Sequence, residues 1–300
     1  MASDKLQAMR VFRRVAELGS FSAAADDLNM TPATVSKHIA FLEYNVGTRL
    51  IHRTTRRMHL SDAGTYYLSN LRRMLDELDD VESQVRGLDA SPRGRIRINA
   101  PMSFGLMHLP SVIDSFLATY PDIEIDLQLN DHVVDLVEQG VDLALRIRDQ
   151  LADSSMPARQ LCATHRVVCA SPQYLEKHGT PQHPDDLMQH NCLVYSRQLS
   201  PNSWQLGEHQ VVVNGQYSVD SSLAIRESVL NGQGITLTPT FLVFEDLRAG
   251  RLRGILTEYP PSGHHLFAVF PPGRRRPDRV RLFLEHLMDA FGSPPYWDNY

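Results

Sequence analysis

The sequence has few cysteines, no long apolar run and no export signal. Its three cysteines leave an odd thiol if any two pair, and so low a number is typical of a reducing compartment. No apolar run reaches the roughly 18 residues that a membrane helix needs. The first 20 residues mix charged and apolar side chains at helical spacing, unlike a secretory signal or a transit peptide. These absences predict a cytoplasmic protein without a membrane partner.

Motifs of catalysis and of cofactor or metal binding are also missing. The sequence has no G-x-S-x-G elbow, no P-loop and no C-x-x-C pair. The loose set His183, His190 and Cys192 lacks the spacing of metal ligands, as does the pair His264-His265. The cysteines lie in apolar segments and are interpreted as core thiols. We therefore expect no enzyme activity, no catalytic residue, no metal and no cofactor.

The net charge of -5 by itself argues against a nucleic-acid partner, but the charge is distributed unevenly along the chain. Residues 31–60 carry one acid, Glu43, against five basic residues, which are Lys37, Arg49, Arg53, Arg56 and Arg57. Residues 74–89 reverse this balance with six acids and one arginine. Because phosphates respond to local charge, the basic segment indicates a nucleic-acid surface despite the negative total.

The first 47 residues predict three helices. Apolar residues recur at steps of three and four through the first 16 positions, which is the pattern of one helical face. Ser22 is predicted to cap a short second helix over 23–28. Thr31 is expected to cap a third helix that begins at Pro32 and stops at Gly47. Two short helices joined by a tight turn are typical of a helix-turn-helix.

The third helix has one apolar face and one face suited to a DNA groove. Its inner stripe is predicted to be Val35, Ile39, Leu42 and Val46. Its outward face holds Ala33, Ser36, Lys37, Ala40 and Tyr44, with Thr34 on the flank. Small and hydrogen-bonding side chains crowd the N-terminal half, which is the half that enters the major groove in this motif. We therefore interpret this helix as the recognition helix.

A basic, threonine-rich segment at 50–60 is predicted to form a short hairpin, a wing beside the third helix. Ser61 then starts a fourth helix with an apolar stripe over about 20 residues. Such a stripe must be buried, and the identical helix of a partner chain offers a surface for it. Leu75 and Leu78 are expected to face that partner rather than their own core. The break at 91–94 marks a domain boundary.

Beyond residue 94, strand-like and helix-like segments alternate, which indicates α/β units. The predicted strands lie at 95–99, 123–129, 143–148, 167–170, 235–237 and 266–270. The predicted helices lie at 106–119, 133–139, 172–178, 223–231, 241–248 and 278–291. With the helical first part, the chain is expected to be α+β overall.

Residues 3–64 resemble the N-terminal domain of the LysR-type transcriptional regulators, with the spacing held without gaps. The matching residues are Phe12, Val15, Ala16, Gly19, Ser20, Phe21, Ala24, Ala25, Leu28, Ser36, Ile39, Leu42, Glu43, Gly47, Leu50, Arg53, Leu60, Ala63 and Gly64. Later stretches at 168–175, 190–193 and 250–252 resemble the family's effector domain. The run Arg53–Arg57 and the string HGTP at 178–181 resemble the CrgA-like branch of the family.

The resemblance implies an architecture and a set of partners. It implies a winged helix-turn-helix at 1–64, a linker and dimerisation helix at 65–90, and an effector-binding domain at 91–300. That domain would have two α/β lobes like those of periplasmic binding proteins, with lobe 1 at about 92–163 and 266–293 and lobe 2 at about 164–265. The resemblance also implies a homodimer, usually doubled to a homotetramer, that binds double-stranded operator DNA of dyad symmetry. An activator of this kind would contact RNA polymerase as well.

Two sets of site residues are expected. Those expected to bind DNA are Ser22, Thr31, Pro32, Ala33, Thr34, Ser36, Lys37, His38, Arg53, Thr55, Arg56 and Arg57. Those expected around a small-molecule effector, from their places at strand ends and helix starts, are Ser103, Arg146, Arg148, Arg197, Ser221 and Thr238. Hydroxyl and guanidinium groups in such places suit a small anion. Alternatively, the arginines pair with local acids such as Asp142 or Asp149.

Two other classes of protein compete with a DNA-binding regulator. A solute-binding protein would fit the second part of the chain, but it would not explain the first 64 residues or the missing signal peptide. An enzyme fused to a DNA-binding module would need a nucleophile–base pair or a metal site, and the sequence has neither. The regulator is therefore the favoured interpretation, with its effector, its target genes and the choice between activation and repression left open.

Overall fold

The computed structural model describes residues 2–53, 58–85, 92–132, 134–149, 156–198, 200–273 and 276–300. The chain splits into two compact units. The first comprises Met1–Arg95 and Val134–Val141, and the second comprises Ile96–Val133 and Asp142–Tyr300. Each unit contains a hydrophobic core made from its own residues.

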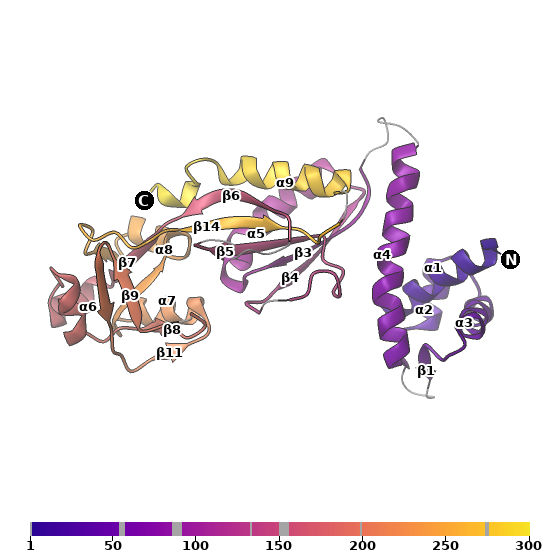
Figure 1. Cartoon of the computed structure of the whole chain (residues 1–300), viewed down its shortest axis with the longest axis horizontal. Coiled ribbons are helices and arrows are strands. Elements are labelled where there is room, and N and C mark those ends of the chain that lie inside the picture. The colour runs from indigo at the N-terminus through magenta and orange to yellow at the C-terminus, as the bar shows by residue number, and fades with distance from the viewer. Residues whose placement is uncertain are drawn as a thin grey trace. The chain divides into compact units, whose positions relative to one another are not determined.

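Three helices open the first unit: α1 (Ala2–Leu18), α2 (Phe21–Asp27) and α3 (Pro32–Val46) (Figure 1). The predicted ends of α3 are confirmed. Thr31 Oγ1 accepts the N–H of Thr34 at 3.2 Å, and Pro32 is the first helical residue. Gly47 ends α3 in the left-handed conformation, which only glycine adopts without strain. These caps set where α3 begins and ends.

The start of α2 differs from the prediction. Ser20, and not Ser22, is the cap, and its hydroxyl accepts the N–H of Ala23 at 3.3 Å. The reason is the turn before it: Gly19 has a φ of 62°, so the chain leaves α1 and enters α2 within two residues. Ser22 therefore lies inside α2 with its side chain exposed.

The wing and the long fourth helix are present as predicted. Strands β1 (Ile51–Arg53) and β2 (Met58–Leu60) pair antiparallel, with His52 opposite His59. Helix α4 (Asp62–Val85) follows Ser61, whose hydroxyl accepts the N–H of Gly64 at 2.9 Å (Figure 1). A side chain at Gly64 would meet the carbonyl oxygen of Leu50 at 2.0 Å, so α4 can start this close to the wing only with glycine there.

The expectation that Leu75 faces a partner chain is wrong. Leu68, Leu71 and Leu75 of α4 are 6%, 2% and 2% exposed and lie in the core of their own unit, with Phe12 of α1 and Ile39 of α3. Helix α4 therefore completes this core with the N-terminal half of its apolar stripe. Leu78, which was expected to face the same partner, is half-buried.

Within the second unit, lobe 1 is a five-stranded sheet of order β4-β3-β5-β14-β6 with helices α5 and α9 (Figure 1). The strands are β3 (Gly94–Ala100), β4 (Ile123–Leu129), β5 (Leu143–Arg148), β6 (Ala158–Thr164) and β14 (His264–Val269). The helices are α5 (Met102–Thr119), which begins four residues before its predicted start, and α9 (Asp278–Phe291). Apolar side chains of alternate strand positions join those of α5 and α9 in one core.

The helix predicted over 133–139 is absent from the part of that range that the structure describes, 134–139. A single turn replaces it, in which the Asp135 carboxylate accepts the N–H groups of Val137 and Glu138 at 2.8 and 3.0 Å. Gly140, at a φ of 65°, then ends the turn. The apolar spacing is real, but the aspartate and the glycine leave room for only one turn between them.

Lobe 2 has a three-stranded sheet of order β12-β7-β13, a parallel pair β11-β8 and the hairpin β9-β10. The strands are β7 (Arg166–Ala170), β8 (Val194–Tyr195), β9 (Ser203–Leu206), β10 (His209–Val212), β11 (Ser218–Val219), β12 (Ile235–Pro239) and β13 (Arg253–Ile255). The helices are α6 (Pro172–His178), the 3-10 helix η1 (Pro184–Gln189), α7 (Ser222–Leu230) and α8 (Thr240–Arg248). The chain crosses between the lobes at His165, between β6 and β7, and again before β14.

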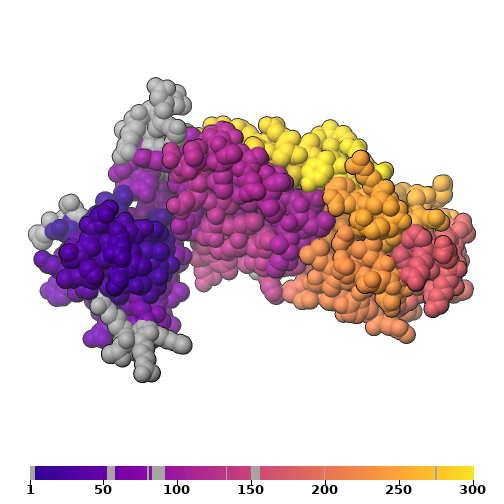
Figure 2. All heavy atoms as spheres, turned by 180° about the vertical axis from the view of Figure 1, so that it is seen from behind, coloured from indigo at the N-terminus to yellow at the C-terminus, as the bar shows by residue number. Residues whose placement is uncertain are grey.

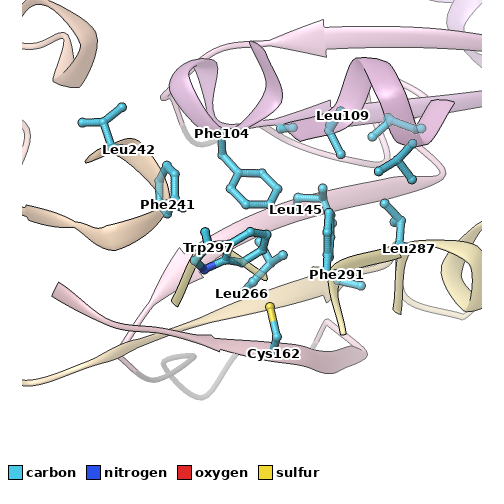
Figure 3. Close-up of a cluster of buried hydrophobic side chains, with 14 of the residues drawn as sticks. Phe104, Leu109, Leu145, Cys162, Phe241, Leu242, Leu266, Leu287, Phe291 and Trp297 are labelled. Carbon is cyan, nitrogen blue, oxygen red and sulfur yellow. The ribbon is translucent and has the colours of Figure 1, made fainter. Parts of the chain in front are cut away.

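One aromatic-rich core joins the two lobes. Figure 3 shows Phe104 of α5 beside Phe241 of α8 and Trp297, a residue beyond α9. Trp297 belongs to a short 3-10 helix, η2 (Tyr296–Asp298). The three cysteines are buried, as expected, and burial raises the pKa of each thiol to about 12. These thiols are therefore protonated at neutral pH.

Candidate nucleic-acid interface and ligand site

Helix α3 has a buried face and an exposed face. Val35, Ile39 and Leu42 are 0–1% exposed and pack into the core, as predicted. The exposed residues of α3 are Pro32, Ala33, Lys37, Ala40, Tyr44, Asn45 and Val46, so Val46 does not belong to the buried stripe. Lys37 thus projects from a helix surface whose neighbouring side chains are small, which lets the backbone of another molecule come close.

The hydroxyl groups at the start of α3 are linked to each other. Thr31 Oγ1 and Thr34 Oγ1 are 2.8 Å apart, and Thr31 is exposed while Thr34 is half-buried. Ser36 and His38 are also half-buried, on the flanks of the exposed face. The structure therefore brings Thr31 and Thr34 together beside Lys37, at the N-terminal end of the helix.

Glu43 positions the wing, a role that its sequence pattern did not reveal. One carboxylate oxygen, Oε1, accepts the N–H of Leu50 at 2.9 Å and the N–H of Ile51 at 3.1 Å. The single acid of the basic segment is thus turned toward the backbone where β1 begins. Its isolation among basic residues and its place in the family pattern are signals in the sequence, but neither identifies its partners.

The wing carries part of the predicted DNA-binding set. Arg53 is the last residue of β1, and Thr55, Arg56 and Arg57 lie outside the described residues. His52 and His59 are exposed, with ring centroids 5.3 Å apart across the two strands. Arg49, just before the wing, is exposed as well.

Ser103, predicted to help bind an anion, lies in the first turn of α5 and is 9% exposed. The N-terminus of this helix already has an acidic partner, because the Asp131 carboxylate accepts the N–H of Met102 at 3.0 Å. Asp131 also lies near Tyr195 of lobe 2. Burial, with the charge of Asp131 as the next cause, raises the pKa of Tyr195 to about 12. A free anion at this helix end would compete with Asp131.

Arg146 and Arg148 lie on one face of the lobe 1 sheet. They are two positions apart on β5, and they pair across to Phe267 and His265 of β14. Arg146 is half-buried, and its Nη1 donates to the carbonyl oxygen of Leu145 at 2.8 Å. Burial, and then the charge of Arg148, lower the pKa of Arg146. The two guanidinium groups thus repel each other on the same surface.

The acids expected to neutralise these arginines have other partners. Asp142 accepts the N–H of Arg97 at 2.9 Å, and Asp149 Oδ1 lies 2.6 Å from His264 Nε2. Among the residues that the structure describes, no ion pair to Arg146 or Arg148 is found. This arrangement favours the interpretation in which the two arginines bind an anion from outside the chain.

Of the predicted effector residues of lobe 2, Arg197 and Ser221 have structural partners and Thr238 is buried. Arg197 bridges the lobes, with Nη1 at 3.2 Å from His132 Nδ1 and Nη2 donating to Asp220 at 2.9 Å. Ser221 caps α7 by accepting the N–H of Ala224 at 3.4 Å. Thr238, in β12, is 4% exposed. These contacts therefore do not bring all six predicted effector residues together in one site.

The described residues contain no group of three potential metal ligands. No helix in that part of the chain is long and apolar enough to cross a membrane.

Two family profiles match the chain. The profile described as "Bacterial regulatory helix-turn-helix protein, lysR family" matches residues 6–65, and the one described as "LysR substrate binding domain" matches residues 89–292. The chain is 35% identical to the regulator PtxR of Pseudomonas aeruginosa over 97% of this chain and 94% of that protein. It is 34% identical to the regulator CrgA of Neisseria meningitidis serogroup C over 95% and 96% of the two chains.

Solved structures of LysR-type regulators are similar to this chain as well. The structure of CrgA from Neisseria meningitidis is similar with a TM-score of 0.63 and 32% identity, over 95% of this chain and 98% of that chain. The Vibrio cholerae virulence activator AphB is similar with a TM-score of 0.59 and 27% identity, over 95% and 98% of the two chains.

Proposed function

The chain belongs to the LysR family of DNA-binding transcriptional regulators, and we propose that α3 and the wing form the surface with which it binds operator DNA of dyad symmetry. The observation that carries this proposal is the two-faced α3. Its apolar side chains are buried, while Lys37 and the hydroxyl-bearing start of the helix lie on the side away from the core. The chain is a transcriptional regulator and not an enzyme.

We assign two kinds of contact to this surface. Lys37, Arg53, Arg56 and Arg57 would bind phosphates, which gives affinity without much sequence preference. Ser22, Pro32, Ala33, His38 and Thr55 would line the surface that approaches the DNA. Thr31, Thr34 and Ser36 carry hydroxyl groups that can reach base edges or phosphates from the start of α3. Their link at 2.8 Å supports Thr31 and Thr34 acting as a pair.

The test is operator binding by the full chain, footprinted on the DNA beside its own gene. Lys37→Ala should weaken binding and reduce the slope of affinity against salt by about one ion, because one phosphate contact is lost. Ser36→Ala should cost about 1–3 kcal/mol on the proper site and little on random DNA. Lys177→Ala, which removes an exposed lysine of α6, is the matched control and should bind like wild type. Wild-type binding by both test variants would refute the contact assignment.

Regulators of this family oligomerise, and we propose that this chain forms a homodimer through α4 and doubles to a tetramer through its effector domains. Because Leu75 belongs to the chain's own core, the interface must use other residues. Tyr66, Met74 and Val81 of α4 are 75%, 55% and 57% exposed, and their spacing of eight and seven residues places them on one side of the helix. That exposed stripe supports an antiparallel or parallel contact with a second α4.

The effector is proposed to be a small organic anion that binds to Arg146 and Arg148. The support is the pair of guanidinium groups on one sheet face, whose neighbouring acids are bonded elsewhere. Ser103, Arg197, Ser221 and Thr238 would contribute hydroxyl and guanidinium groups around the ligand. The α5 N-terminus, where Asp131 already lies, is a poorer place for the negative group.

The remaining proposals follow from the family. We assign residues 1–64 to DNA binding, 65–90 to the linker helix and 91–300 to effector binding. Lobe 1 then comprises about 92–163 and 266–293, and lobe 2 about 164–265. We propose that the protein acts in the cytoplasm, which its family's binding to DNA supports. If it activates transcription, RNA polymerase is a further partner.

A further inference from the structure

The last residues of the chain form a segment that the family profile does not cover. The LysR substrate binding domain profile ends at residue 292, and α9 ends at Phe291. Residues 293–300 continue beyond both. Trp297 in this segment is 0% exposed, although Tyr300 nearby is 53% exposed. A tail that was merely surplus would not bury its largest side chain completely.

Trp297 packs against helices of both lobes. Its ring lies 5.7 Å from Phe104 and 4.9 Å from His108 of α5, both in lobe 1. Its ring also lies 6.5 Å from Phe241 of α8, in lobe 2. Figure 3 shows the indole between Phe104, Phe241 and Phe291, and Figure 2 shows the C-terminal residues on the surface beside residues of both lobes. Separating the lobes would therefore expose this indole on one side.

The residue before Trp297 strengthens the connection through His108. Tyr296 Oη is 2.5 Å from His108 Nδ1, and His108 Nε2 is 3.1 Å from the carbonyl oxygen of Phe241. A carbonyl only accepts, so Nε2 carries the proton and Nδ1 accepts the hydroxyl proton of Tyr296. One imidazole thus links α5 of lobe 1, α8 of lobe 2 and the C-terminal segment.

The residue after Trp297 binds at the crossing between the lobes. The Asp298 carboxylate accepts the hydroxyl proton of Thr240 at 2.6 Å, and its other oxygen is 2.8 Å from His165 Nδ1. Thr240 also donates its backbone N–H to the carbonyl oxygen of His165 at 2.9 Å. His165 lies between β6 of lobe 1 and β7 of lobe 2, and Thr240 is the first residue of α8. Asp298 therefore holds both segments that a hinge here would have to move.

We propose that Tyr296, Trp297 and Asp298 form a C-terminal strap that locks the two lobes of the effector domain into one arrangement. With the strap in place, rotation of the lobes about His165 requires the indole to leave its site and the Asp298 contacts to break. The strap thus keeps the lobes acting as one body, and an effector would change the orientation of whole domains rather than open and close this one. The proposal goes beyond DNA and effector binding and does not depend on where the effector binds.

The test measures the distance between the lobes in the full chain. Spin labels are attached to cysteines introduced at Asp122, in lobe 1, and at Glu208, in lobe 2, which are both exposed. The native thiols are buried and protonated, so they do not compete for the label. Labelled chains are mixed with excess unlabelled protein, so that pairs within one chain dominate. Electron–electron dipolar spectroscopy then gives the distribution of distances between the labels.

Wild type and Tyr300→Ala, the matched control in the same segment, should give one narrow distribution. Trp297→Ala should broaden it about twofold or add a second distance, while operator binding stays at the wild-type level. Asp298→Asn weakens the polar contacts without emptying the core, so it decides the question if Trp297→Ala fails to fold, and it should broaden the distribution less. An unchanged narrow distribution in the folded variants would overturn the strap. Loss of operator binding with unchanged distances would do so as well, because it would place these residues in another role.

Discussion

The buried imidazole of His108 should make the effector domain sensitive to mild acid. His108 is 1% exposed, and burial lowers its pKa from the ordinary value near 6.5 to about 4. The unfolded chain therefore binds a proton at His108 more readily than the folded chain does between pH 6.5 and pH 4. The contribution of neutral His108 to stability is thus present above pH 6.5 and is lost progressively as the pH falls toward 4.

The magnitude follows from the difference between the two pKa values. One pKa unit corresponds to about 1.4 kcal/mol, so a difference of about 2.5 units amounts to about 3 kcal/mol once both states are protonated. At pH 5 only the unfolded state is largely protonated, and the loss relative to pH 7 is about 2 kcal/mol. That is a large part of the stability of a typical domain.

The assay is urea unfolding of the full chain at pH 7 and pH 5, followed by tryptophan fluorescence. Both tryptophans, Trp204 and Trp297, belong to the second unit, so the signal reports on that unit. His108→Gln is the comparison, because its amide can donate to Phe241 and accept from Tyr296 but does not titrate. The free energy of unfolding of wild type should fall about 2 kcal/mol more than that of the variant. Equal losses in the two proteins would refute the reasoning, since other titrating groups are common to both.

Further outcomes are expected at four positions. Glu43→Ala should weaken operator binding although Glu43 itself does not contact DNA, because the backbone N–H groups of Leu50 and Ile51 at the start of the wing lose their acceptor. Glu43→Gln should recover part of the affinity, and an equal loss in both variants would contradict this role. Val81→Lys should dissociate the dimer, as measured by sedimentation. Leu75→Ala should instead lower the free energy of unfolding by about 2–5 kcal/mol, because it leaves a cavity in the core. Arg148→Ala should abolish the change that an anionic ligand causes in the footprint, while DNA binding without ligand persists. An unaltered ligand response would show that the effector site does not include Arg148.

The ends of α3 could be predicted from sequence because their causes are local. The Thr31 cap, the proline at the first position and the left-handed glycine at the end each act within one turn of the helix. The cap of α2 was missed for the converse reason. Which of two nearby serines caps the helix depends on the turn at Gly19, and a serine at either position fits the local pattern.

The periodicity of apolar residues does not predict contacts between segments that lie far apart in the sequence. The stripe on α4 correctly indicated burial, but a repeat of apolar residues does not say whether its partner is another chain or α1 of the same one. Strand β6 has the sequence ARQLCAT, with little alternation, and it is a strand because β14 pairs with it about 100 residues later. Short polar strands such as β8 and β11 owe their pairing to the lobe around them.

In the candidate sites too, features with local causes could be predicted and features that depend on distant contacts could not. Lys37 and the small residues of α3 were predicted from helical geometry alone. Glu43 was not, because its partners lie seven and eight residues away, beyond the turn at Gly47. Arg146 and Arg148 were placed at a strand end, but the fact that Asp142 and Asp149 are bonded to other groups needed the fold.

The Asp131 carboxylate already occupies the N-terminus of α5, so any anionic ligand at this helix end must compete with it. Its carboxylate is part of the same chain and lies two residues beyond the end of β4, so its effective concentration at the Met102 N–H is at least on the order of millimolar. A free carboxylic acid present at micromolar concentration cannot displace such a group by charge alone. A ligand whose acid group lies here must gain its affinity from contacts that Asp131 does not make, so this occupied helix end directs the acid group of an effector toward Arg146 and Arg148 instead.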